Sequence, residues 1–351
     1  MPGISYNVRG EEMVKVLLVY FSGTGMTRYF TTLIQAEMVK RGYRCDIADL
    51  EELVDMPTLW QKKPVALRYT IRAEEKRPLG KYPWPYLDLD FAIASAKPVQ
   101  ALDKLGKKWS DYDLIGFGSP VYAFRPAPVM IRFLLDLPFF DKKIRAFSYA
   151  THDGAQGDYE PFMKNLLKSK GFKYVGHLDQ TFINSALAVM LKKFDHLKTG
   201  RLLLDKSFRA RKNIFLFLEY INSLFYGIPF RYRQANPVEK ILGIPYRFAY
   251  SYGIDFLLNN FLFGFGIHKE DCILCMTCVQ QCPQGLIELD DEGYPIRHYH
   301  CMYCLRCLNW CPTDALYFSP LTDGKARFPG PETLLEAVHQ DNLGRRIDVE
   351  E

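Results

Sequence analysis

The segment CILCMTCVQQCP (272–283) recurs as CMYCLRCLNWCP (301–312), and the two copies contain eight of the nine cysteines in the chain. Each copy has the spacing Cys-x-x-Cys-x-x-Cys-x-x-x-Cys-Pro. A cubic iron–sulfur cluster has four iron corners that each take a thiolate, and three cysteines at two-residue intervals let one tight loop wrap one face of the cube. The fourth corner must be reached from further away, and the proline after the last cysteine ends the loop. The spacing therefore predicts two [4Fe-4S] clusters.

Two other uses of these cysteines explain the pattern less well. Zinc sites also use Cys-x-x-Cys pairs, but zinc needs neither a third cysteine in the run nor the Cys-Pro ending. Disulfides suit small secreted domains, and the polar segment 1–12 lacks the pattern of a secretory signal. Thiolate ligands need a reducing compartment, so the cytoplasm is the simplest location to expect.

The same segment resembles the two-cluster bacterial ferredoxins over about residues 266–318, although its link 283–300 is somewhat long and polar. In that family the fourth cysteine of each run ligates the other cluster. The resemblance implies a first cluster on Cys272, Cys275, Cys278 and Cys311, and a second cluster on Cys301, Cys304, Cys307 and Cys282. The ninth cysteine, Cys45, is expected to be buried rather than reactive.

Near the N-terminus, a short apolar run (14–21) is typical of a buried parallel strand, and a helical pattern (28–41) follows it. The loop between them consists of Ser22, Gly23, Thr24, Gly25, Met26 and Thr27. Backbone N–H groups and hydroxyls at a helix N-terminus bind a phosphate. The loop has no lysine and no G-x-G-x-x-G, so it is neither a Walker A site nor a dinucleotide fingerprint. An ordinary strand-to-helix turn is the alternative.

This loop resembles the FMN phosphate loop of flavodoxins, Ser/Thr-x-Thr-Gly-x-Thr. Ser22, Thr24, Gly25 and Thr27 match that pattern, and Met26 replaces the common asparagine. Flavodoxins contact the flavin with two further loops, which here would follow the strands 112–118 and 143–150. The implied contacts are Ser119, Pro120, Val121, Tyr122, Ala123 and Phe124 in the first of these loops, and Thr151, His152, Asp153, Gly154 and Gly157 in the second.

Four side chains in these loops have a specific candidate role. Tyr122 is the first candidate for stacking on the flavin and Phe124 the second, with plain packing as the alternative. His152 and Asp153 are candidates for proton transfer to the flavin, with loop hydrogen bonding as the alternative. No residue stands out as a catalytic acid, base or nucleophile.

The expected fold class is α/β, a flavodoxin-like doubly wound five-stranded parallel sheet followed by a small α+β domain of the bacterial ferredoxin type. Further strands are expected at 44–50 and 173–180, and helices at 92–108, 129–137 and 159–171. The predicted domains are 1–182 for the FMN-binding part with an insertion at about 55–90, 183–265 for a basic, aromatic-rich and mostly helical connector, 266–318 for the ferredoxin-like part, and 319–351 for a polar tail with one helix at 332–340.

Charge is divided unevenly between these parts. The chain carries +5, whereas 266–318 has seven acids against three bases and 319–351 has seven against four. These two segments therefore carry −4 and −3, and 1–265 carries +12. Opposite signs can hold two parts together or steer a charged partner. Nothing in the chain resembles a nucleic-acid-binding module.

The connector has two interpretations. Residues 192–247 hold twelve lysines and arginines against four acids, interleaved with apolar runs. Charges, glycines and prolines interrupt these runs, which argues against membrane-spanning helices. We expect the helices of the connector to pack between the domains. The alternative is a basic amphipathic helix within 192–265 that lies on an anionic membrane surface.

Taken together, the chain resembles the flavodoxin–ferredoxin fusions of the EFR1 type found in anaerobic bacteria and archaea. This resemblance implies an electron-transfer protein that relays electrons between FMN and two [4Fe-4S] clusters, with a redox protein as its external partner and a homodimer as an open alternative. A flavin-dependent oxidoreductase that reduces a small organic substrate is the first alternative. A module with structural clusters and no flavin is the second.

Overall fold

The computed structural model describes residues 13–53, 108–122, 125–141, 144–154, 156–157, 159–183, 194–227, 264–297, 301–318 and 322–350, without the side chains of 342–350. The predicted insertion at 55–90 lies outside these residues, and so does nearly all of the helix expected at 92–108. Ala123 and Phe124 also lie outside them, as do most of the second half of the connector and residues 319–321.

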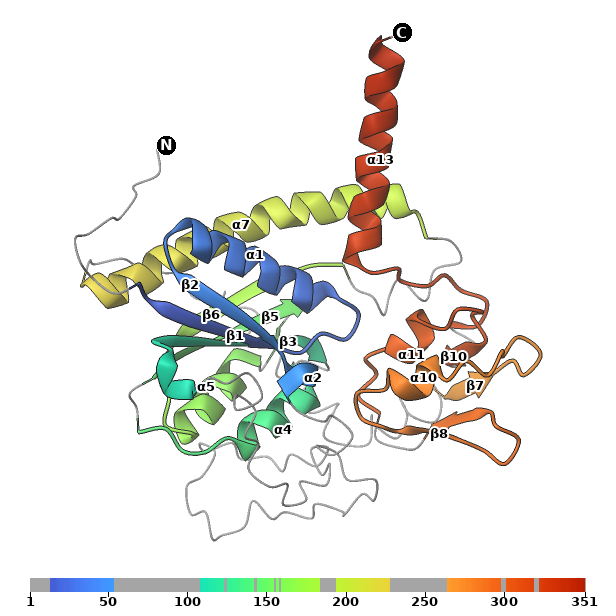
Figure 1. Cartoon of the computed structure of the whole chain (residues 1–351), viewed down its shortest axis with the longest axis horizontal. Helices are drawn as coiled ribbons and strands as arrows, with labels where there is room; N and C mark the ends of the chain where they lie inside the picture. The colour runs from blue at the N-terminus through green and yellow to red at the C-terminus, as the bar shows by residue number, and fades with distance from the viewer. Residues whose placement is uncertain are drawn as a thin grey trace.

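A parallel sheet forms the first half of the molecule (Figure 1). Its strands are β1 (Lys15–Tyr20), β2 (Arg44–Asp49), β3 (Leu114–Tyr122), β5 (Arg145–His152) and β6 (Lys173–Thr181), in the order β2-β1-β3-β5-β6. A short β4 (Arg125–Pro126) pairs antiparallel with β3. The five parallel strands have the order of the flavodoxin-like doubly wound fold, in which ligands bind where the order reverses, between β1 and β3. The predicted fold class is confirmed.

Two strands are longer than expected. β3 continues through Tyr122, and Ser119 and Pro120 pair with Ala150 and Thr151 of β5, which itself continues to His152. The sequence placed these residues in loops because glycine and proline interrupt the apolar runs. Backbone pairing between two central strands outweighs those interruptions, so the predicted site residues lie on or beside strand ends.

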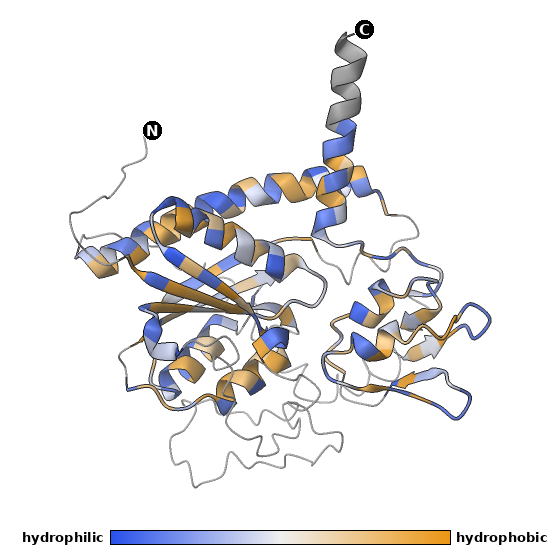
Figure 2. Ribbon diagram, viewed as in Figure 1, coloured by the Kyte–Doolittle hydropathy of each residue, from blue (hydrophilic) through white to orange (hydrophobic). Residues whose placement is uncertain are grey.

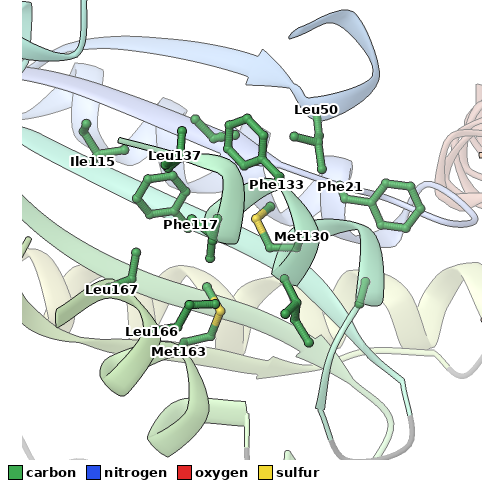
Figure 3. Close-up of a cluster of buried hydrophobic side chains, with 14 of the residues drawn as sticks. Phe21, Leu50, Ile115, Phe117, Met130, Phe133, Leu137, Met163, Leu166 and Leu167 are labelled. Atoms are coloured by element: carbon green, nitrogen blue, oxygen red, sulfur yellow. The ribbon is translucent and has the colours of Figure 1, made fainter. Parts of the chain in front are cut away.

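Helices cover both faces of the sheet, because both faces of each central strand are buried. They are α1 (Met26–Lys40), α2 (Leu50–Leu53), the 3-10 turn η2 (Trp109–Asp111), α4 (Pro128–Asp136) and α5 (Tyr159–Ser169). Along β1, Leu17, Val19 and the following Phe21 join the core under α4 and α5 (Figure 3). Val16, Leu18 and Tyr20 join a second core under α1.

Two long helices extend this second core. α7 (His196–Tyr226) begins where Asp195 caps the Lys198 N–H at 2.8 Å, and it buries Leu203, Ile214 and Phe217 against α1 and β6. α13 (Pro331–Glu350) is much longer than the helix predicted at 332–340, and it crosses α7 at Gly200, where a side chain would meet the Leu334 carbonyl. α7 therefore packs against the sheet domain through α1 and β6, whereas packing of the connector between the two domains stays a prediction.

The outer side of α7 is mixed in character (Figure 2). Phe208 and Phe215 are exposed there among basic residues. Within the described part of the chain, no helix is both long enough and apolar enough to cross a membrane.

The cysteine-rich part is small and built from two similar halves. Its elements are β7 (Phe265–Ile267), α10 (Thr277–Gln280), β8 (Ile287–Leu289), β9 (Pro295–Arg297), α11 (Arg306–Asn309) and β10 (Leu316–Phe318). β7 pairs with β10 and β8 with β9, both antiparallel, around a core that includes Leu308 and Phe318. Figure 1 shows this part beside the edge where β1 and β2 end.

Candidate functional site

The predicted phosphate loop leads from β1 into α1. Gly25 takes the left-handed conformation (φ 96°), which glycine adopts without strain, and α1 then begins at Met26 rather than at Arg28. No described side chain caps this helix end, so its first N–H groups stay available. The Ser22 hydroxyl is buried and has no hydrogen-bond partner among the described residues. A phosphate would supply the acceptor that these groups lack.

The loop after β5 meets the phosphate loop directly. The hydroxyls of Thr27 and Thr151 are hydrogen-bonded at 2.7 Å, so two of the three predicted cofactor loops share one contact. Gly157 is left-handed (φ 57°), and nothing lies within 4 Å of the Cβ position at Gly154. Gln156 is 3% exposed and its Oε1 has no partner among the described residues. Sequence reasoning passed over Gln156, although its place between two glycines of a candidate loop was a usable signal.

His152 is held by a carboxylate. Its Nε2 lies 3.1 Å from Asp179 Oδ2 on β6, and its buried Nδ1 has no partner in the described structure. Burial opposes ionisation of Asp179, but the hydrogen bond from His152 and the nearby His177 outweigh it and lower the pKa of Asp179. The pair fixes the orientation of the imidazole beside the cofactor loops. Asp153, by contrast, is exposed.

The residues after Gly118 divide into two groups. Ser119 is fully buried and bonded to the Tyr159 hydroxyl and the Ala127 N–H, so its role is to join β3 to α5 and α4. Tyr122 instead reaches the phosphate loop, where its hydroxyl lies over the Cα of Gly23. Burial, followed by the nearby Cys304, raises the pKa of Tyr122 well above its ordinary value. Pro120 and Val121 are partly buried beside it.

These three loops fit a flavin that carries a phosphate. They combine a helix N-terminus without a side-chain cap and the buried side-chain oxygens of Ser22 and Gln156, which have no partner in the described part of the chain. They also contain Gly23, where a side chain would collide with the Tyr122 hydroxyl. The hydroxyls and N–H groups suit a phosphate monoester, and the glycines after β5 leave room for a ring edge.

The eight motif cysteines lie in two groups. Cys272, Cys275, Cys278 and Cys311 line one hollow of about 400 Å³, including its open mouth. Cys282, Cys301, Cys304 and Cys307 lie close enough to influence one another's ionisation, and burial followed by Cys304, Cys301 and Cys282 raises the pKa of Cys307. The structure therefore places Cys311 with the first loop and Cys282 with the second.

Both loops adopt the same unusual backbone. Leu274 and Met276 in the first loop and Tyr303 and Leu305 in the second all have positive φ, between 54° and 64°. Non-glycine residues take this conformation rarely and mostly at functional sites. Successive turns of this kind gather N–H groups around an anion. The Tyr303 N–H already donates to Cys301 Sγ at 3.3 Å, and the Leu286 N–H to Cys282 Sγ at 3.3 Å.

A single metal ion would need a different arrangement of these side chains. In the described residues, no three His, Cys, Asp or Glu side chains converge closely enough to hold one ion. Thiolates around a cube are spread over separate iron atoms, so the two kinds of site differ in spacing.

The two loops differ in their surroundings. Cys275 is exposed and Ile273 is 63% exposed, whereas Cys304 and Cys307 are buried. Met302 and Cys304 belong to the same core cluster as Phe21 of the sheet domain. The carbonyl oxygen and Cβ of Cys304 lie 3.3 and 3.4 Å from the position that a Cβ on Gly23 would take.

Arg306 joins the second loop to the sheet domain. Its guanidinium donates to the carbonyls of Ser22 (2.6 Å) and Gly23 (3.0 Å) and to both carboxylate oxygens of Glu51. The residue is 4% exposed. Sequence reasoning counted Arg306 only as a charge, although Thr277 at the equivalent place in the first copy made the arginine stand out.

Comparisons with known proteins support iron–sulfur cluster sites in the cysteine-rich part. The family described as "4Fe-4S dicluster domain" matches residues 271–315. The pyruvate synthase subunit PorD of Pyrococcus horikoshii is 48% identical over 29 residues, which are 8% of this chain and 28% of that subunit. The chain thus spans under a third of that relative.

Similar solved structures have low identities and low scores. A putative flavoprotein from Bacteroides uniformis is 14% identical over 50% of this chain and 96% of its own (TM-score 0.29). A flavoprotein in complex with FMN from Lactobacillus acidophilus is 17% identical over 47% and 93% (TM-score 0.27). The fold assignment therefore rests on the strand order itself.

The strand order and the matched cysteine motif define the class. The chain joins a flavodoxin-like α/β domain to a ferredoxin-like 4Fe-4S dicluster domain. This combination of a fold and a cysteine motif supports a redox role in electron transfer.

Proposed function

We propose that this protein is an electron-transfer protein that holds FMN and two [4Fe-4S] clusters and relays electrons between them and an external redox protein. One observation carries the proposal. Cys304, which would ligate the second cluster, packs against Gly23 of the phosphate loop. A cluster ligand packed against a flavin loop brings the two redox groups close together, which favours electron transfer within one chain.

The placement of the two loops gives the relay an order. The second loop is buried against the flavin loops, so its cluster is the inner one. The first loop carries the exposed Cys275, so its cluster is the outer one and faces an external partner. FMN accepts or gives one or two electrons and each cluster one at a time, which allows such a protein to pair or split electrons.

The chain's own residues prepare the two kinds of site. Ser22 and the N-terminus of α1 would hold the phosphate, and Thr151, His152 and Gln156 would line the far side of the flavin site. The N–H groups of Tyr303 and Leu286 stabilise thiolate charge at the second cluster. Tyr122 and Met302 pack in or against the core shared by the sheet domain and the second cysteine loop, where they would keep water from both sites.

A redox titration tests the proposal. The full chain, purified anaerobically, should contain one FMN and about eight irons. Flavin absorbance and cluster EPR should change together as electrons equilibrate, and a partner-free protein should still pass electrons from reduced clusters to the flavin. Iron without flavin, or flavin and clusters that titrate with no exchange, would refute the relay.

A further inference from the structure

Arg306 contacts the phosphate loop from the side that faces the second cluster. Its Nε and Nη2 groups donate to the carbonyls of Gly23 and Ser22, and its Nη1 and Nη2 groups donate to the two carboxylate oxygens of Glu51. A guanidinium that makes charge-assisted bonds in a buried, forked geometry holds its partners more firmly than a neutral donor would. Phe21 and Trp310 flank the guanidinium, 5.7 and 4.9 Å from their ring centroids.

The same peptide units have a second side. In a trans peptide the C=O and the following N–H point in opposite directions, and no described peptide bond is cis. The carbonyls of Ser22 and Gly23 are therefore joined to the N–H groups of Gly23 and Thr24, which point away from Arg306. These N–H groups belong to the loop that would hold the phosphate. A cation on the carbonyl side polarises each peptide and strengthens its N–H as a donor.

We propose that Arg306 couples flavin-phosphate binding to the docking of the second cluster loop. This inference rests on the proposed function and adds its regulation. Because energetic coupling between two sites is reciprocal, a phosphate on the loop tightens the docking of Arg306, and docking tightens the hold on the phosphate. The inner cluster is then held beside the flavin site most firmly when that site is filled.

The neighbouring residues support this coupling. Glu51 neutralises the guanidinium, so the buried charge is paired whether or not a phosphate is present. Gly23 lets the Cys304 backbone approach the loop closely. On the other flank, Pro331 lies against Gly25, with Cδ 2.9 Å from its Cβ position, and Arg28 pairs with Glu332 at 2.9 Å, so the loop is supported from both sides.

Flavin binding to the full-length, iron-loaded and flavin-free chain tests the inference. Quenching of flavin fluorescence gives the affinity for FMN and for riboflavin, which lacks the phosphate. Arg306→Met should weaken FMN binding by roughly tenfold, within the range typical of coupled sites, and should leave riboflavin binding unchanged. Arg306→Lys keeps the charge without the fork and should fall between. Thr277→Met, at the equivalent place in the first loop, should match the wild type.

Hydrogen exchange gives an independent reading of the reciprocal effect. FMN should slow amide exchange in residues 301–311 of the wild type but not of Arg306→Met, and iron content should be unchanged in every variant compared. Equal losses of FMN and riboflavin affinity would mean that Arg306 only supports the fold, and would overturn the coupling. Equal FMN affinity in wild type and Arg306→Met would also overturn it and leave the relay intact. A wild type that binds no FMN would refute both.

Discussion

The two cysteine loops are nearly the same in sequence pattern and backbone, yet they occupy opposite environments. Both have two left-handed residues at the same places, Leu274 and Met276 in one and Tyr303 and Leu305 in the other. The first loop is exposed, and the second is buried against the sheet domain. At the third position of the last Cys-x-x-Cys, the first loop has Thr277 and the second has Arg306. Local spacing thus defines a cluster site, whereas the contacts that each loop makes outside the motif differ, and Arg306 contacts the sheet domain from the second loop.

Replacing one cysteine ligand in each loop should have the largest effect and should separate the roles of the two clusters. Cys304→Ser removes a ligand of the buried inner cluster but keeps the carbonyl and Cβ that lie near Gly23, so we expect about four irons per chain and loss of electron exchange with the flavin. Cys275→Ser, in the exposed loop, should also leave about four irons but keep that exchange. Iron analysis and EPR during flavin titration measure both. Equal loss of flavin exchange in the two variants would contradict the order of the clusters.

A methyl group at the interface should have the next largest effect. In Gly23→Ala the new Cβ overlaps the Tyr122 hydroxyl, which must move, and it lies 3.3 Å from the Cys304 carbonyl, which must give slightly. We expect about 1–3 kcal/mol of destabilisation, typical of overpacking, together with weaker FMN binding. Gly154→Ala is the matched control for stability alone, because nothing lies within 4 Å of its Cβ position. Denaturant unfolding compares the two, and a Gly23→Ala protein as stable as the control would argue against close contact.

Lowering the pH should destabilise the sheet domain, against which the second cysteine loop packs. Burial lowers the pKa of His177 to about 4, below its ordinary value near 6.5. The unfolded chain therefore binds the proton first, and stability falls as the pH drops from about 6.5 towards 4, by up to about 3 kcal/mol. His177→Gln should flatten this part of the profile. Thermal unfolding followed by circular dichroism between pH 7 and 5 measures it, and unchanged pH dependence in His177→Gln would rule out this origin.

The smallest structural effect is expected at the rim of the first loop. Ile273 is 63% exposed beside Cys272, so Ile273→Ser should change stability by no more than about 0.5 kcal/mol. FMN affinity should stay at the wild-type value. Electron exchange with an external redox protein should slow, because the apolar contact next to the outer cluster is lost. Stopped-flow mixing with a reduced ferredoxin measures this rate, and an unchanged rate would place the external contact elsewhere.

Much of the site followed from sequence, for a physical reason. Cluster ligation depends on residues two or three positions apart, and the phosphate loop on six consecutive residues, so short-range pattern carries both. The extension of β3 was missed because Ser119 and Pro120 pair with β5, which is remote in the chain, and Val121 and Tyr122 pair with the two-residue β4. The place of Gln156 between two glycines was a usable signal, but only the structure shows that its Oε1 is buried without a partner among the described residues. The His152–Asp179 pair was missed because it joins two separate strands.

The sequence by itself determined that the chain has two cysteine loops of one spacing, a hydroxyl-rich loop between a strand and a helix, and a parallel α/β order. Only the tertiary structure decided how these sites face one another. Arg306 is 255 positions away from Glu51 and 283 from Gly23, and no local pattern encodes contacts over such separations. They arise because burial of the second loop against the end of the sheet brings the guanidinium to a carboxylate and two free carbonyls that can satisfy it.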